Sequence, residues 1–280
     1  MRPGQARLPD GQAGPAETLM VAVYLYCLAR PGASVSVVST GVDGECPVNL
    51  IPYNNLLAVI SEVRVEEFVG PEAEARMRDL AWVGPRACRH EEVIEQVIRS
   101  SPVLPAGFAT LFSSREKLGQ WLEEHYEAIS SALDRFVDHE EWAVKGTLDR
   151  RKAEARLMAT TLAREGGLLS SSPGARYLEE RRIQAESCQE IDAWLKEVSA
   201  KIANALLEHA AEFRIRDVVS GQAPDEEGVS ILNWAFLVHR HHLDDFREQL
   251  RWVNAQQFNH GLVLTLSGPW PPYSFCPPLE

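Results

Sequence analysis

The sequence predicts an α+β protein of two domains, with long helices and an extended C-terminal tail. The length of 280 residues suits two domains of ordinary size. A hydrophobic share of 45% against a charged share of 24% is enough to build real cores. Strand patterns alternate with helical ones, and in the second half their order is β-α-β-β-α-β. That order is the ferredoxin-like arrangement, an antiparallel sheet with helices on one face.

The first residues are expected to contribute no regular structure. Residues 1–18 are rich in Gly, Pro and Ala, and we predict a disordered N-terminal tail. The apolar run from Leu19 to Ala29 imitates a signal-peptide core, but Tyr24 and Tyr26 alternate as in a strand and no convincing cleavage site follows. The run is also too short to span a bilayer. We therefore expect a buried strand in a cytoplasmic protein with no membrane span.

The N-terminal domain is predicted to cover residues 19–139 and to be an α/β sandwich related to the C-terminal domain. Apolar runs bounded by turn residues, such as Asp43-Gly44, predict its strands, and helical spacing predicts its helices. The expected strands are Val21–Ala29, Val35–Thr40, Leu56–Glu62 with the preceding "VNLIPY", and an edge strand within Pro102–Phe112. The expected helices are Glu72–Trp82, Pro85–Arg99 and one long helix that begins after Ser113 and reaches Val137.

Two residues of the long helix carry specific expectations. Ser113 is expected to form a capping box with Glu116. His125 lies on the apolar face, where a single histidine is more often a core residue than a metal ligand, because ligands come in clusters. The pattern restarts after "DHEEW", which places the domain boundary near Val137–Glu141.

The C-terminal domain is predicted to cover residues 140–268 and to be the ferredoxin-like one. Ser172 is the expected N-cap of its long helix, with Pro173 at the first helical position. The expected strands are Glu141–Leu148, Ile215–Gly221, Ser230–Val238 and Leu262–Ser267. The expected helices are a stretch ending near Arg164, the long helix at about 173–213, and a helix at His242–Asn254.

Residues 269–280 are predicted to form an extended Pro/aromatic tail. Pro269, Pro271 and Pro272 cannot donate ladder hydrogen bonds, so pairing is expected to stop before them, at Gly268. Trp270, Tyr273 and Phe275 then either dock on the same chain, in the crevice between the domains, or hold a partner. We favour docking, because three free aromatic side chains would themselves be an aggregation liability.

Charge and cysteine content limit the classes of partner. A net charge of -12 argues against nucleic acid and anionic membranes, which need clustered Lys and Arg. The 5 cysteines are scattered without CxxC spacing, as is typical of reduced thiols in the cytoplasm.

Catalytic motifs are sparse. The sequence contains no GxGxxG after a strand, no phosphate-binding GxxxxGK(S/T) loop and no GxSxG. Cys88 and His90 lie two apart on a predicted helix and so point to different faces. In "VHRHH", His239, His241 and His242 lie where a strand meets a helix, so their side chains are expected to diverge. Carboxylates are abundant, but none has an apolar setting that would raise its pKa. We predict no metal and no cofactor.

Four segments, in chain order, carry a resemblance to a known family. They are "RHEEVIEQVIRSSPVLPAGFATLF" (Arg89–Phe112), "SPGARYLEERR" (Ser172–Arg182), "LNWAFLVHR" (Leu232–Arg240) and "GPWPPYSF" (Gly268–Phe275). Together they closely resemble the gas vesicle protein F/L family, over about Leu19 to Phe275. The match departs at Ala106, Gly107 and Ala109, where the family leads us to expect a large residue, a basic residue and Gly.

The resemblance implies an accessory protein of gas vesicle assembly rather than an enzyme. Members look like minor or transient components that bind the hydrophobic shell protein and prevent its aggregation during nucleation. The implied partners are the major shell protein and other accessory proteins, and the implied locations are the gas vesicle and the cytoplasm. Partner contact is expected first around Phe108 and Phe112. The alternative is an enzyme or ligand-sensing protein that uses a cleft between its two domains.

Overall fold

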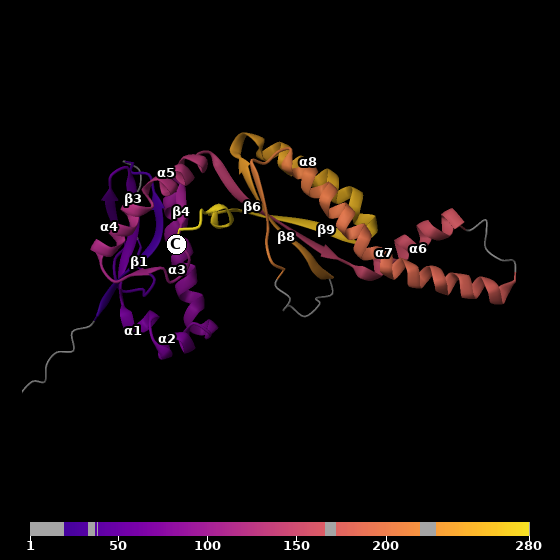
Figure 1. The fold of residues 1–280 in the computed structure, drawn as a ribbon, viewed down its shortest axis with the longest axis horizontal. Coiled ribbons are helices and arrows are strands. Elements are labelled where there is room, and N and C mark those ends of the chain that lie inside the picture. The colour runs from indigo at the N-terminus through magenta and orange to yellow at the C-terminus, as the bar shows by residue number, and fades with distance from the viewer. Residues whose placement is uncertain (1–19, 33–36, 38, 166–171, 219–227, 280) are drawn as a thin grey trace, which may run out of the picture.

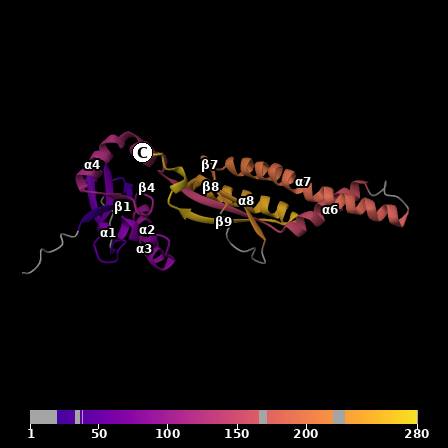
Figure 2. The ribbon, with the colours of Figure 1, turned by 60° about the horizontal axis from the view of Figure 1, so that its bottom comes forward.

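The molecule is elongated and is built on two separate antiparallel sheets, as the computed structural model shows (Figures 1 and 2). The structure describes residues 20–32, 37, 39–165, 172–218 and 228–279. One sheet lies in the N-terminal half, up to residue 136, and the other in the C-terminal half, from residue 139 to residue 270. A pair of long helices reaches away from the second sheet toward the far end of the molecule (Figure 1). The predicted α+β class is confirmed.

The N-terminal sheet is centred on β1, Val21–Ala29, which is buried on both faces from Ala22 onward. The strand order is β2-β3-β1-β4, and β5 also pairs with β1. Alternate residues of β1 enter two different apolar clusters, so each face of the sheet has its own core. The other strands are β2 (Asn49–Tyr53), β3 (Leu56–Arg64), β4 (Val103–Pro105) and β5 (Leu111–Phe112).

Helices cover both faces of this sheet. On one face, α3 (Leu80–Ile98) packs through Val93, Ile94 and Val97, beside the short α1 (Val65–Phe68) and α2 (Pro71–Arg76). On the other face lie α4 (Arg115–Glu124) and α5 (Tyr126–Arg135). The apolar clusters explain why β1 reads as a continuous hydrophobic run rather than as an alternating one.

Three helix boundaries of the N-terminal half differ from the prediction. The first predicted helix ends at Arg76 rather than at Trp82, and the second begins at Leu80 rather than at Pro85. The Asp79 carboxylate accepts the Ala81 N–H at 2.9 Å and so starts α3 before Pro85. The cap of α4 is Ser114, not Ser113, and it accepts the Lys117 N–H at 3.3 Å.

The predicted long helix is two helices. At His125 the backbone leaves the helical region (φ -108°, ψ 10°), and the ring bonds the Trp121 carbonyl through Nδ1 at 2.9 Å. The edge strand expected over residues 102–112 is likewise interrupted, because Ala109 has a φ of 64° and turns the chain between β4 and β5. Most of the strand expected at Val35–Thr40 lies outside the described residues, and Thr40 forms an isolated bridge with Pro47.

The C-terminal sheet has the strand order β7-β8-β6-β9, and every neighbouring pair is antiparallel. Helices cover one of its faces, with Ile202 and Leu206 of one helix and Phe246 and Leu250 of another in the same core (Figure 1). The strands are β6 (His139–Leu148), β7 (Glu212–Ile215), β8 (Val229–His239) and β9 (Leu262–Trp270). The helices are α6 (Arg150–Glu165), α7 (Pro173–Leu207) and α8 (Leu243–Gln257). The short 3-10 turns are η2 (Arg240–His242), η3 (Phe258–His260) and η4 (Tyr273–Phe275).

The edge of this sheet at β9 is partly covered by a side chain. The Asn254 amide of α8 donates to the Leu264 carbonyl at 3.0 Å, and its oxygen accepts the Leu264 N–H at 2.9 Å. One backbone donor and one backbone acceptor of the edge strand are therefore already satisfied.

Three predictions for the C-terminal half were wrong. α7 ends at Leu207 rather than near residue 213, because Phe213 enters β7 and packs on Phe236 at 4.9 Å between ring centroids. The strand expected at Ile215–Gly221 is therefore earlier, at Glu212–Ile215, and residues 219–221 lie outside the described residues.

The last strand does not stop at Gly268. β9 continues to Trp270, which pairs with Glu141 across a bulge in β6. Gly268 makes this path possible, because its φ is 137° and an added Cβ would lie 3.1 Å from the Trp142 ring. The tail that follows is not extended throughout either, because Tyr273–Phe275 form the 3-10 turn η4.

Substitution of Gly268 should therefore destabilise the protein. We expect Gly268→Ala to lower the free energy of unfolding by more than about 1 kcal/mol, because alanine is strained at this φ and meets the Trp142 ring. Gly84→Ala is the matched control, since a Cβ at this position in α3 meets nothing within 4 Å. The control should be neutral or more stable by about 0.5–1 kcal/mol. Urea denaturation of both variants is the measurement, and equal effects would contradict the account of Gly268.

Candidate functional site at the seam between the two sheets

The two halves meet in a shared apolar cluster, which we call the seam. Phe136, at the end of α5, lies in the same cluster as Leu104 of β4 and as Ala235 and Leu237 of β8. Phe275 joins this cluster and is only 2% exposed. The open face of the C-terminal sheet is thus covered in part by the N-terminal half and by the end of the chain.

The C-terminal segment, residues 271–279, runs through the seam toward β4 (Figure 1). Pro271 and Pro272 are buried, and Cys276 and Leu279 pack against the seam. The Cys276 thiol lies 3.8 Å from the Pro105 carbonyl of β4, and burial raises its pKa to about 12. Because β4 is the last strand in its sheet, the segment covers part of an edge that would otherwise expose backbone groups.

A buried carboxylate ties the C-terminal segment to β6. Glu141 is 1% exposed, and its carboxylate accepts the Ser274 N–H at 2.9 Å and the Ser274 hydroxyl at 3.0 Å. Arg216 pairs with the same carboxylate, and its Nε donates to the Ser274 hydroxyl oxygen at 2.7 Å. Burial lowers the pKa of the Arg216 guanidinium. The charges are therefore both paired and hydrogen-bonded, as buried ions must be.

Two further polar contacts tie the segment to the N-terminal half. The Tyr273 hydroxyl donates to Glu91 Oε1 of α3 at 2.7 Å. Burial raises the pKa of both the Glu91 carboxyl and the Tyr273 hydroxyl. The Phe275 carbonyl accepts a hydrogen bond from Arg135 of α5, whose Nε also pairs with Glu212 of β7 at 3.2 Å.

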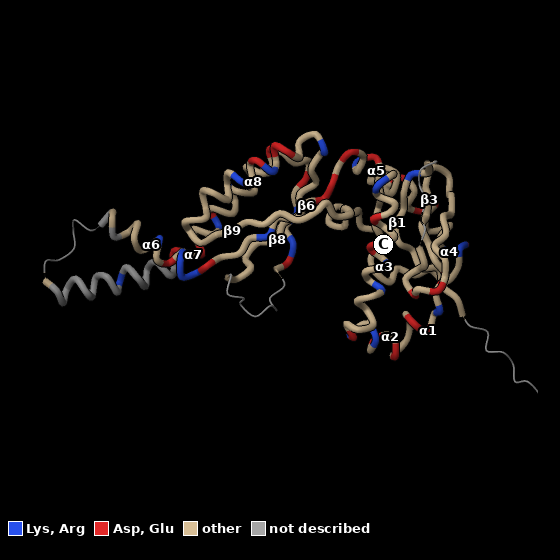
Figure 3. The backbone as a smooth tube through the Cα atoms, turned by 180° about the vertical axis from the view of Figure 1, so that it is seen from behind, with Lys and Arg blue, Asp and Glu red and all other residues tan. Residues whose placement is uncertain are grey.

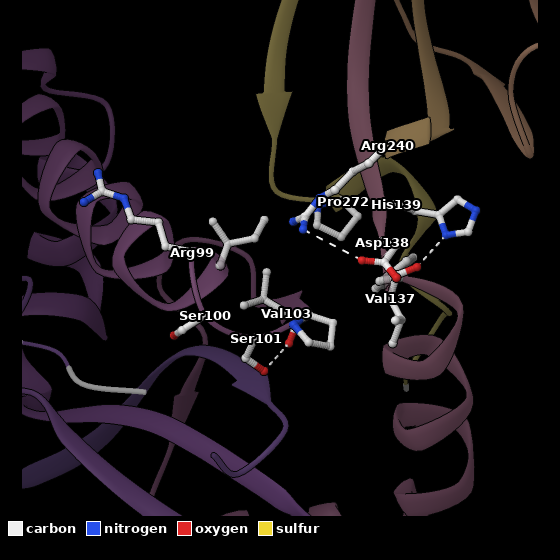
Figure 4. A pocket seen from close by; sticks show the side chains of 12 residues that line it. Arg99, Ser100, Ser101, Val103, Val137, Asp138, His139, Arg240 and Pro272 are labelled. Carbon is white, nitrogen blue, oxygen red and sulfur yellow. Dashed lines mark hydrogen bonds and ion pairs between the residues drawn. The ribbon is translucent and has the colours of Figure 1, made fainter. Parts of the chain in front are cut away.

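A cavity of about 220 Å³ opens beside the seam, between the end of α3 and the start of β6. Figure 4 shows Arg240 and Asp138 facing each other in it, with Nη1 and Oδ1 3.9 Å apart. Ser101 and Pro272 also line it, and the Ser101 hydroxyl donates to the Pro102 carbonyl at 3.0 Å. Because charges of both signs line the cavity, it does not select a strongly charged small molecule.

The histidines of "VHRHH" come together rather than diverge. The ring of His239 lies 4.9 Å from His139, 5.1 Å from His241 and 5.9 Å from His242, between centroids. Within the part of the chain that the structure describes, no group of three His, Cys, Asp or Glu side chains is placed to hold a metal ion. Partial desolvation, and then the neighbouring imidazoles, lower the pKa of His239.

A second polar network is buried in the N-terminal half. The Tyr24 hydroxyl accepts the Ala109 N–H at 3.1 Å and lies 3.0 Å from Nδ1 of His90. His90 Nε2 lies 3.2 Å from the Ala106 carbonyl, so Nε2 carries the proton and the tyrosine donates to Nδ1. Burial lowers the pKa of His90 to about 4. Cys88 is exposed while His90 is 1% exposed, so the expectation that they face different ways is confirmed.

The five aromatic residues singled out from the sequence do not form one surface. Phe108 packs against the face of β1 that α3 covers, whereas Phe112 packs against the opposite face, 5.4 Å from Trp121 between centroids. Both are half-buried. Phe275 lies at the seam and Tyr273 packs against the α3-side cluster, whereas the Trp270 ring is 45% exposed and its N–H donates to the Ser267 hydroxyl at 3.3 Å. The expectation that Trp270 is a buried aromatic is wrong.

Sequence reasoning also missed the polar residues of the seam. It found no carboxylate in an apolar setting, yet Glu141 is buried and burial raises the pKa of Glu91. One signal was available for Glu141, since it starts the strand pattern "EWAVKGTL" on the same face as Ala143. Nothing local marked Arg216 as its partner.

Comparison with known proteins identifies the family. The sequence matches the model of the family described as "Gas vesicle synthesis protein GvpL/GvpF" over residues 22–277. The chain belongs to this family. The resemblance found in the sequence is thereby confirmed, and it places the protein among those of gas vesicle synthesis.

Named relatives match over most of their length. Gas vesicle protein L of Streptomyces sp. is 28% identical over 259 residues, which cover 90% of this chain and 92% of that protein. Gas vesicle protein F of Streptomyces sp. is 26% identical over 260 residues, covering 91% of this chain and 99% of that protein.

Two crystal structures share the fold. GvpF from Anabaena sp. superposes with a TM-score of 0.65 at 17% identity and covers 92% of this chain and 97% of its own. GvpF from Microcystis aeruginosa gives 0.63 at 16%, with 92% and 99% covered. No helix in the described ranges combines the length and apolar character that crossing a membrane requires.

Acid should weaken the fold through His90. The folded pKa of about 4 lies below the ordinary value of 6.5, so the unfolded chain takes up a proton first as the pH falls. The stability that the neutral ring contributes is present above pH 6.5 and is lost as the pH falls from 6.5 to about 4. This loss amounts to about 3 kcal/mol at most. His90→Gln, which does not titrate, should show a flatter dependence in urea denaturation between pH 7 and pH 4, and identical slopes would contradict the assignment.

Substituting Phe275 and Trp270 by alanine, one at a time, should show that only Phe275 contributes much to stability. Phe275→Ala should lower the free energy of unfolding by about 3–5 kcal/mol, because it empties a buried site. Trp270→Ala should change it by less than about 1 kcal/mol, since the ring is 45% exposed. Guanidinium denaturation compares them, and a larger effect at Trp270 would show that the C-terminal segment is seated differently.

Proposed function

We propose that this protein is an accessory protein of gas vesicle assembly that binds the hydrophobic shell protein and prevents its aggregation during nucleation. The observation that carries the proposal is the match to the gas vesicle synthesis family over residues 22–277. The protein acts in the cytoplasm and at the gas vesicle, as a minor or transient component beside other accessory proteins, and it is not an enzyme.

The physical task is to keep an apolar partner dispersed. A shell subunit that lines a gas space exposes a large apolar face, which is an aggregation hazard before assembly. This chain has a net charge of -12, and in Figure 3 Asp and Glu are interspersed with Lys and Arg along both halves. A bound complex would inherit that charge and repel its copies.

We further propose that residues 19–139 and 140–268 are the two domains and that the second is ferredoxin-like. Support comes from the strand order β7-β8-β6-β9 with helices between its strands, which is the order of a split βαβ unit. The first domain, with helices on both faces of its sheet, presents a surface of its own to partners.

We place the shell-protein contact on the N-terminal half. Val69 is 56% exposed and Leu80 is 84% exposed, at the end of this half where α1, α2 and the start of α3 lie (Figure 1). Phe108 packs in the α3-side cluster, which also contains Phe68 of α1 and Trp82 of α3, and is half-buried, whereas Phe112 belongs to the opposite face. We therefore place the contact on the α3 side, to which Phe108 belongs and Phe112 does not.

A ligand-sensing role is the second candidate. The cavity of about 220 Å³ between the halves favours it, because small-molecule sites occur at such interfaces. Calorimetric titration of the purified protein with cytoplasmic metabolites distinguishes the two roles, since a saturable ligand without any effect on shell-protein solubility favours sensing.

Co-expression with the shell protein should raise its soluble fraction and yield a complex that co-purifies. Because the contact is chiefly apolar, the complex should persist at 1 M salt, where the Debye length is about 3 Å. Dissociation at that salt would instead indicate charge pairing.

The surface itself is tested by exposed substitutions that should not disturb the fold. Leu80→Glu should reduce the co-purified shell protein several-fold, because it puts a charge into the apolar contact. Trp252→Glu on α8, where the ring is 59% exposed, is the matched control and should bind as the parent does. The reverse pattern would move the contact to the C-terminal half.

A further inference from the structure

We propose that the 3-10 turn η4, Tyr273–Phe275, is a three-way junction that fixes the orientation of the two sheets relative to each other. A 3-10 helix has three residues per turn, so three successive side chains leave it in directions about 120° apart. In this turn each of the three residues binds a different part of the molecule.

The first arm of the junction holds the N-terminal half. The Tyr273 hydroxyl donates to Glu91 of α3 at 2.7 Å, and the ring packs against the apolar cluster on the α3 side of β1. Both residues are half-buried, so the bond is worth more than it would be on the open surface.

The second arm holds the C-terminal half. Ser274 donates to the β6 carboxylate of Glu141 through its N–H and through its hydroxyl, and it accepts from Arg216 after β7. If the turn left its place, Glu141 would lose two of its donors, and its ion pair with Arg216 would lose part of its cover. The carboxylate therefore holds the turn against displacement.

The third arm lies between the halves. The Phe275 ring enters the seam, which contains β4 and α5 residues from one half and β8 residues from the other. Arg214 of β7 lies over the same ring at 5.5 Å, and Arg135 of α5 donates to the Phe275 carbonyl. A single residue thus contacts both halves through its ring and its backbone.

Apart from the apolar seam, in which Leu104 and Phe136 pack with Ala235 and Leu237, the described links between the halves are weaker. The chain passes from the first half to the second at Val137–Asp138, and the Arg135–Glu212 pair is partly exposed, at 43% and 22%. Exposed ion pairs stabilise little, so these weaker links alone would leave the halves free to move relative to each other. The junction adds polar anchors on both halves to the seam, and together they fix the angle between the N-terminal half and the helical pair α6 and α7, which projects from the other end (Figure 2).

The test uses the full chain and removes the polar arms without emptying the seam. Tyr273→Phe deletes the bond to Glu91, and Ser274→Ala deletes the hydroxyl contacts with Glu141 and Arg216. Trp270→Ala is the matched control, because this ring lies on the same stretch of chain but is 45% exposed. Differential scanning calorimetry reports how the halves unfold, and small-angle X-ray scattering reports the spread of molecular dimensions.

We expect the parent and Trp270→Ala to unfold in one cooperative transition with a narrow range of maximum dimensions. The double variant should keep its circular dichroism but unfold in two transitions, with a broader range of dimensions. A single transition at lower temperature with unchanged scattering would overturn the proposal, since it would make the turn ordinary core packing. If the double variant loses its circular dichroism, Tyr273→Phe alone decides: broadened scattering supports the junction, and scattering identical to the parent's overturns it.

Discussion

Glu141 carries a charge that is almost completely withdrawn from water, and the seam is organised around satisfying it. The idealised transfer of such an ion into a protein interior is very costly, so it persists only with a counter-charge and a full set of hydrogen bonds. Arg216 supplies the charge and Ser274 supplies two donors. Ser274 lies close to the end of the chain. The need of the Glu141 carboxylate in β6 for hydrogen-bond donors therefore fixes the position of the last residues.

A difference between the two sheets explains why the halves need this seam. Helices cover both faces of the N-terminal sheet, and β1 is apolar on both sides. Helices cover only one face of the C-terminal sheet, yet Ala143, Ala235 and Leu237 on the other face are buried. The N-terminal half and the C-terminal segment provide the missing cover, so the second sheet completes its core with residues that are distant in the sequence.

Local patterns predicted the elements that local forces determine. The apolar runs of β1 and β8 and the helical spacing of α8 gave boundaries within a few residues, because burial of one stripe or face fixes them. Boundaries were missed where two local solutions compete, as at His125 and Phe213. At His125, a hydrogen bond from the ring to the Trp121 carbonyl accompanies the end of the helix. At Phe213, a ring contact with Phe236 of β8 places the residue in a strand instead of a helix.

The site was less predictable, because its partners are distant in sequence. Glu141 lies 75 residues from Arg216 and 133 residues from Ser274, and no periodicity relates such positions. Composition alone could not separate Trp270 from Phe275 either, since both occupy the same proline-rich stretch. The difference arises from β9, which continues to Trp270 and keeps that ring on the rim of the sheet, so that only the residues after it reach the seam.

The amide of Asn254 has a consequence for association between copies of the chain. By occupying the N–H and carbonyl of Leu264, near the start of β9, it removes two of the backbone groups that an incoming strand would need for pairing. An edge strand interrupted in this way is a poorer template for strand addition. At this position of β9, the amide therefore limits strand pairing between copies of this gas vesicle synthesis protein.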